Sequence, residues 1–114
     1  MHRGEVWLIN LDPAIGAELK KTRPAIIVNN DAIGLLPLKV IVPVTAWKDH
    51  YQVPPWLVRL EPDEADGLDK PSAADPFQVR SLSQQGLVRK LGQIADANMG
   101  RITAGLALVL DIPG

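Results

Sequence analysis

The stretch EVWLINLDPAIGAELKKTRPAIIVNN (residues 5–30) holds two apolar runs separated by a polar segment that ends in KKTRP (20–24). The first run, GEVWLIN (4–10), is rich in β-branched and aromatic residues, which is typical of a strand. The second run, PAIIVNN (24–30), is short and continuous, as expected for a strand covered on both faces. Asp-Pro and Ile-Gly pairs between the runs mark a loop. The stretch therefore predicts two strands joined by a loop, with several charges crowded at the start of the second.

Composition predicts one domain over residues 1–114 with an aliphatic core, because 46% of the residues are apolar and only 4% are aromatic. The absence of cysteine excludes disulfides, thiolate catalysis and zinc–thiolate sites, and it fits a reducing, cytoplasmic location. The segment MHRGEVWLIN (1–10) lacks the pattern of a signal peptide. No apolar run approaches the roughly 18 residues of a membrane span, so no membrane association is expected.

Charge is distributed unevenly although the net charge is only −1. Residues 61–75 hold six of the 13 acids and one of the 12 bases, which leaves 11 bases and seven acids for the rest of the chain. The sequence therefore predicts an acidic loop and a small basic surface elsewhere.

Four further strands are expected, followed by a change of periodicity. Pro43 lies inside one of these strands and needs an edge or bulge position, because it cannot donate to a ladder. At the end, apolar residues recur at helical spacing, with Asp96 or Asn98 as the cap and Pro113 as the stop. Several short strands and one terminal helix predict a mainly β fold, a small barrel-like sheet with a C-terminal α-helix on its side. The expected strands are 38–47, 56–62, 77–83 and 87–94, and the apolar helix face is Met99, Ile102, Leu106, Val109 and Leu110.

Two polar positions next to apolar strands admit two interpretations each. Arg23 belongs either to a solvated turn or to a site where its planar fork of donors binds a phosphate, with Glu18 available to orient it. Thr45, near the end of VPVTAW (42–47), is either an ordinary β-branched strand residue or a hydroxyl donor at a site. His2 and His50 have no acid at metal-ligand spacing, and no phosphate-binding glycine motif is present, so no metal and no cofactor are expected.

A resemblance that covers essentially the whole chain decides between these interpretations. The segments RGEVW (3–7), PAIGAE (13–18) and RPAIIVNND (23–31) resemble the opening of the MazF/PemK family of toxin endoribonucleases. The resemblance continues through VIVPVTAW (40–47), FQVRSLS (77–83) and RKLGQI (89–94). It implies an SH3-like β-barrel of the CcdB/PemK type with a C-terminal helix, assembled as a homodimer. It further implies metal-independent, sequence-specific cleavage of single-stranded RNA, neutralised by a cognate antitoxin that is a disordered acidic tail.

The resemblance also assigns residues. It implies that Arg23 and Thr45 are catalytic, and that Glu18 is either a base for the 2′-hydroxyl or the residue that orients Arg23. Gln78 and Arg80 match a Gln-x-Arg pair that lies near the RNA in the family. We expect Lys20, Lys21 and Arg80 to contact phosphates, and Trp47, His50 and Tyr51 to stack on unpaired bases. Burial at a strand end is the alternative for Trp47.

The chain departs from the family in two places. Phe77 stands where many members carry an acid before the glutamine, which weakens any mechanism that needs that acid. The loop DHYQVPPW (49–56) has an individual sequence, so the base specificity cannot be carried over. A toxin of the CcdB type, which shares the fold but inhibits DNA gyrase without cutting RNA, is the alternative function. The KKTRP and PVT segments favour the nuclease.

Overall fold

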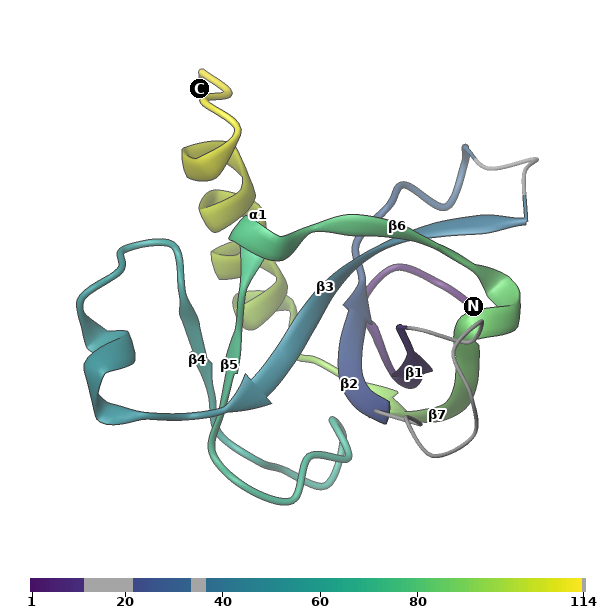
Figure 1. The fold of residues 1–114 in the computed structure, drawn as a ribbon, viewed down its shortest axis with the longest axis horizontal. Helices are drawn as coiled ribbons and strands as arrows, with labels where there is room; N and C mark the ends of the chain where they lie inside the picture. The colour runs from purple at the N-terminus through teal and green to yellow at the C-terminus, as the bar shows by residue number, and fades with distance from the viewer. Residues whose placement is uncertain (12–21, 34–36, 114) are drawn as a thin grey trace.

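A curved antiparallel sheet and one helix make up the computed structural model, which describes residues 1–11, 22–33 and 37–113 (Figure 1). In this part of the chain the main path of the sheet runs β4-β5-β3-β2-β1-β7, and β6 pairs with β3. The helix α1 lies on the β4–β5 side, and the C-terminus projects from its end. The elements are β1 (Glu5–Asn10), β2 (Thr22–Ile27), β3 (Leu38–Ala46), β4 (Val58–Leu60), β5 (Ser72–Ala74), β6 (Arg80–Ser83), β7 (Leu87–Gln93) and α1 (Asp96–Val109), with 3₁₀ helices at Asp49–Gln52, Pro76–Gln78 and Gln84–Gly86.

The sheet closes on itself through β6 and β7. β6 pairs with the first half of β3, and β7 pairs with β1. Only the 3₁₀ helix Gln84–Gly86 separates these two strands, so β1, β2, β3, β6 and β7 form a ring. The predicted class, mainly β and barrel-like with a C-terminal helix, is confirmed.

Pro43 occupies the junction between two partner strands of β3, and the prediction of an edge or bulge position is wrong. β2 pairs with β3 along one side, where Ala25 is opposite Pro43. On the other side, the pairing of β3 with β6 stops at Ile41, and its pairing with β5 starts at Val44. The Pro43 carbonyl faces this second side and accepts from the Asp75 N–H at 3.0 Å. The missing N–H of Pro43 therefore falls where one partner strand gives way to the next.

Two of the expected strands are shorter than predicted. The segment 56–62 contains only β4, and the segment 77–83 begins as a 3₁₀ helix before β6 starts at Arg80. Asp75 caps this helix by accepting from the Phe77 N–H, and Pro76 occupies its first position. Local capping thus overrides the alternating pattern of FQVRSLS. β5 was not predicted, because Ser-Ala-Ala lacks the side chains that favour strands.

The terminal helix was predicted correctly in its extent and only partly in its details. Ile102 is fully buried, and Met99 and Leu106 pack against the same core. Leu110, which its spacing places on the apolar face, is the C-cap of the helix and is 55% exposed in the single chain. The N-cap is Ala95, which has no side-chain hydrogen bond, so neither expected cap residue acts.

Two groups of buried aliphatic residues form the core. One lies between α1 and the sheet, and the other fills the ring of β1, β2, β3, β6 and β7. The first contains Val6, Ile26, Val42, Val44 and Ile102, and the second contains Ile9, Ala25, Ile27, Ile41, Leu82 and Leu87. α1, the one helix longer than a few residues among those described, is too short to cross a membrane.

Candidate active site

A cavity of about 420 Å³ opens where β2 begins and β3 ends. Arg23 and Thr45, the two predicted catalytic residues, both line it. Besides β2 and β3, the loop between β4 and β5, residues 61–71, forms a wall of the cavity. The lining residues are Thr22, Arg23, Pro24, Val44, Thr45, Ala46, Leu68, Asp69, Lys70 and Ser72.

Strand register explains why Arg23 and Thr45 line the same cavity. β2 and β3 are antiparallel, with Ala25 opposite Pro43 as the last pair at this end. Arg23 and Thr45 each lie two residues beyond that pair, on the two strands that flank the cavity. A guanidinium and a hydroxyl placed in this way can bind the same small anionic group.

The loop 61–71 is built from internal hydrogen bonds and is not merely a solvated acidic turn. Asp66 is 2% exposed, and its Oδ1 accepts from the backbone N–H groups of Asp63 and Leu68. The Asp63 carboxylate accepts from the Asp66 N–H at 2.7 Å. Gly67 has φ of +71°, and a Cβ there would overlap the Leu91 carbonyl of β7. These contacts hold the loop against the sheet, and its residues Leu68, Asp69 and Lys70 line the cavity.

Among the described residues, the charged groups that line the cavity are Arg23, Lys70 and Asp69. Over the described ranges, no carboxylate forms an ion pair with Arg23 or Lys70. Arg23 is partly exposed, so its planar fork of donors remains accessible to an anion. Asp69 and Lys70 were missed by the sequence analysis, which treated residues 61–75 as one acidic loop.

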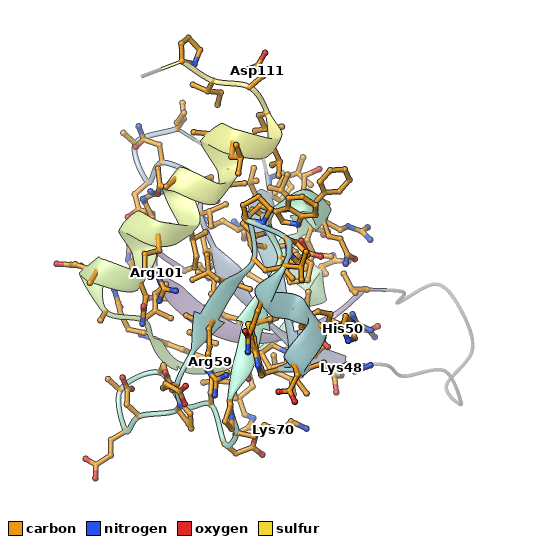
Figure 2. The ribbon with its side chains drawn as sticks, turned by 90° about the vertical axis from the view of Figure 1, so that its left-hand side faces the viewer. Lys48, His50, Arg59, Lys70, Arg101 and Asp111 are labelled. Carbon is orange, nitrogen blue, oxygen red and sulfur yellow. The ribbon has the colours of Figure 1, made fainter. Side chains whose placement is uncertain are left out.

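The three aromatic residues predicted to stack on bases contact one another beside the cavity. The Tyr51 ring lies edge-on to Trp47 at 5.9 Å and to His50 at 4.7 Å. None of the three lines the cavity, but Trp47 directly follows the lining residue Ala46. Figure 2 shows Lys48, His50, Arg59 and Lys70 at the same end of the molecule, away from Asp111 at the end of α1. This end therefore carries both cations and aromatic rings.

Trp47 makes contacts typical of a packed side chain. The guanidinium carbon of Arg59 lies 4.8 Å from the centroid of its ring. The indole Nε1 of Trp47 is buried and has no hydrogen-bond partner in the described part of the structure. Its backbone N–H donates to the Pro71 carbonyl at 3.0 Å, which ties the end of β3 to the loop 61–71.

Gln78 and Arg80 do not line the cavity. The Gln78 side chain donates from Nε2 to Asp75 Oδ2 at 2.8 Å, and both Gln78 and Arg80 are exposed. The Asp75 carboxylate also accepts from the Trp56 indole at 3.2 Å and from the Phe77 N–H at 3.1 Å. Phe77 is 64% exposed, and its ring lies 5.3 Å from that of Trp56. Asp75 is thus committed to local hydrogen bonds and does not replace the acid that Phe77 displaces.

Three predicted residues, Glu18, Lys20 and Lys21, lie outside the described residues. Within the described ranges, no group of three or more His, Asp or Glu side chains is placed to hold a metal ion.

Comparison with known proteins gives a consistent result over the whole chain. A family model described as PemK-like, MazF-like toxin of type II toxin–antitoxin systems matches residues 2–110. Endoribonuclease MazF9 of Mycobacterium tuberculosis is 33% identical over 118 residues, covering 98% of both chains. Endoribonuclease PemK of Escherichia coli is 40% identical over 112 residues, covering 96% of this chain and 82% of PemK.

Solved structures share the fold. A mycobacterial endoribonuclease in complex with its cognate antitoxin aligns with a TM-score of 0.79 at 23% identity, over 100% of this chain and 98% of that one. A crystal structure of MazF from Deinococcus radiodurans aligns with a TM-score of 0.76 at 21% identity, over 98% and 97% of the two chains.

Proposed function

Because the chain belongs to the PemK-like, MazF-like toxin family of type II toxin–antitoxin systems, we propose that it is an endoribonuclease toxin that cuts single-stranded RNA in the cavity of Arg23 and Thr45. Its relatives MazF9 and PemK, both at least 33% identical, carry the name endoribonuclease. The observation that carries the site assignment is that Arg23 and Thr45 line one cavity.

The proposed reaction uses the substrate's own 2′-hydroxyl as the nucleophile. This oxygen loses its proton and attacks the adjacent phosphorus, the bond to the 5′-oxygen of the next nucleotide breaks, and that 5′-oxygen gains a proton. The products are a 2′,3′-cyclic phosphate and a 5′-hydroxyl. The resemblance to the family implies that this reaction needs no metal ion. Because the nucleophile comes from the RNA, the protein needs no cysteine, serine or histidine base.

Arg23 and Thr45 stabilise the charge that develops on the phosphorane. Two parallel N–H groups of Arg23 bind two oxygens of the phosphorane, and the Thr45 hydroxyl donates a hydrogen bond to a third oxygen. Arginine stays protonated at any physiological pH, so its role is electrostatic and not that of a base. Glu18 remains the candidate proton acceptor, with orientation of Arg23 as its alternative role.

RNA binding is assigned to the surface around the cavity. Lys20, Lys21 and Arg80 bind phosphates, Gln78 lies along the RNA, and His50 and Tyr51 stack on bases. Trp47 contributes to the same surface through its packing with Tyr51. Each base stack of this kind is worth roughly 1–3 kcal/mol.

Assembly and regulation follow from the family. We propose that residues 1–114 act as one domain, that two copies form a homodimer, and that the toxin works in the cytoplasm. A cognate antitoxin neutralises it, as expected from the related endoribonuclease that was solved with its own antitoxin. Free toxin would stop translation and growth by destroying messenger RNA.

The test is cleavage of a mixed RNA pool in EDTA, with the cut ends mapped and their chemistry determined. Wild type should leave cyclic phosphate and 5′-hydroxyl ends. Arg23→Ala and Thr45→Ala should each lower the rate by about 10²–10³, because each removes a preorganised donor. Both variants should keep the wild-type unfolding temperature.

Two outcomes would contradict the proposal. Full activity of Arg23→Ala would remove the site assignment. A wild-type protein that never cuts RNA yet binds DNA gyrase would favour the alternative function of a protein-binding toxin with the same fold.

A further inference from the structure

We propose that Lys70 is an RNA-binding residue of this cavity, and that its ammonium group binds a phosphate oxygen of the RNA beside the phosphate held by Arg23. This inference rests on the proposed function and adds a residue to it. Lys70 belongs to the loop 61–71, which otherwise carries acids, and it lines the same cavity as Arg23 and Thr45.

The backbone on both sides of Lys70 is fixed. Its carbonyl accepts from the Ser72 hydroxyl at 2.8 Å, and the next carbonyl, of Pro71, accepts from the Trp47 N–H at 3.0 Å. Before it, Leu68 is buried and donates its N–H to Asp66 at 2.9 Å. Lys70 therefore projects from a segment whose position is set by the end of β3 and by the inner hydrogen bonds of the loop.

The Lys70 ammonium is available for a ligand. None of the salt bridges among the described residues includes it. Two other acids of its loop have their own partners: Asp66 accepts backbone N–H groups, and Glu61 pairs with Arg59. Asp69 is the single described acid of the cavity wall, against the two cations Arg23 and Lys70. The described part of the wall thus carries one net positive charge, which favours a phosphodiester.

The two cations suit different tasks. Arginine presents a rigid fork that matches two oxygens of one phosphate, whereas lysine is a compact point charge that binds from many directions. A lysine in this cavity should therefore hold the RNA backbone and contribute to binding more than to the chemical step. The affinity for single-stranded RNA falls with salt, and the slope of log affinity against log salt concentration becomes shallower by about 0.7 when one phosphate contact is removed.

The experiment compares wild type, Lys70→Gln, Lys70→Arg and Lys39→Gln on an RNA oligonucleotide that carries the cut sequence mapped for wild type. Lys39→Gln is the matched control, since it removes the same charge near the start of β3, six residues and about 20 Å of strand from Thr45. KM and kcat are measured at several salt concentrations. We expect Lys70→Gln to raise KM about tenfold, to lower the slope of log KM against log salt by about 0.7, and to change kcat less than threefold. Lys70→Arg should restore both KM and the slope, and Lys39→Gln should match wild type.

Unchanged KM and slope in Lys70→Gln would overturn the inference, and so would a loss that Lys70→Arg fails to restore, since that would indicate a role in folding. An equal increase of KM in Lys39→Gln would also overturn it, because the effect would then be one of net charge. These failures are distinguishable from failure of the proposed function, in which wild type itself would not cut the RNA.

Discussion

Arg59 covers the ring of Trp47, with its guanidinium carbon 4.8 Å from the ring centroid, while the Tyr51 ring meets the same indole edge-on. Arg59 lies on β4 and Trp47 directly follows β3, so the contact spans β5, which lies between these strands. A tryptophan packed in this way stabilises the fold, in addition to any contact that it makes with a ligand. The alternative of burial at a strand end thus gains support from these contacts.

The first prediction concerns the Trp47–Arg59 pair. Trp47→Ala should lower the free energy of unfolding by about 3 kcal/mol, because a partly buried indole is lost. Arg59→Ala should cost less than about 1 kcal/mol, and the double variant should reveal a coupling of about 0.5–1 kcal/mol. Urea unfolding of the four proteins measures all three quantities. A coupling near zero would mean that the stacked geometry contributes no stability.

The second prediction separates charge from geometry at Arg23. Arg23→Lys keeps the positive charge but loses the planar fork, so kcat should fall about 10²-fold while KM rises only about threefold. Thr45→Ser keeps a hydroxyl at the same place and should retain at least about a tenth of the wild-type rate. Single-turnover cleavage of the mapped RNA measures both. A fully active Arg23→Lys would indicate that a point charge alone suffices.

The third prediction concerns Glu5, a buried carboxylate far from any proposed chemistry. Burial alone would raise its pKa, but hydrogen bonds from the Trp7 indole and the His2 backbone, together with Lys90 and the Met1 ammonium, lower the pKa to about 2. The unfolded chain has the ordinary pKa of 4.5 and binds more protons between these values. Stability from Glu5 is therefore complete above about pH 5 and is lost as the pH falls toward 2.

Urea unfolding of wild type and Glu5→Gln between pH 2 and 7 checks this. The difference in unfolding free energy should be about 1–3 kcal/mol at pH 7 and should shrink steadily below pH 5. Glu64→Gln, which removes a carboxylate from an exposed site, should change stability by less than about 0.5 kcal/mol. A difference that does not depend on pH would contradict the prediction.

The fourth prediction uses two glycines of α1. A Cβ at Gly100 would meet nothing within 4 Å, whereas a Cβ at Gly105 would lie 2.8 Å from the Trp56 carbonyl and 2.9 Å from Pro76 Cγ. Gly100→Ala should raise the free energy of unfolding by up to about 1 kcal/mol through helix propensity. Gly105→Ala should lower it by about 1–3 kcal/mol through overpacking. Thermal unfolding would contradict this reading if both variants shifted in the same direction.

Much of the fold could be predicted from local patterns. The β-branched run at 4–10, the long strand predicted at 38–47 and the helical periodicity around Ile102 each correspond to an observed element. The resemblance placed Arg23 and Thr45 together, and the β2–β3 register gives the physical reason.

The features that were not predicted depend on specific hydrogen bonds, which cannot be recognised from the pattern of residue types. Asp75 caps the turn at Pro76–Gln78 and thereby ends what looked like a regular strand. Asp66 was counted among the acids of the acidic loop, but it is buried and accepts hydrogen bonds within that loop. Lys70 was overlooked for the same reason, since its place on the cavity wall follows from that loop's conformation.

The loop that bears Lys70 rests on the last strand of the sheet: Gly67 packs against the Leu91 backbone, and the Gln93 N–H donates to the Ala65 carbonyl at 2.7 Å. A nascent chain that ended at Ser83 would contain Arg23, Thr45 and Lys70, but it would lack β7, the strand against which the loop packs. The wall of the cavity that bears Lys70 therefore depends on β7, a strand that follows Arg23, Thr45 and Lys70 in the chain.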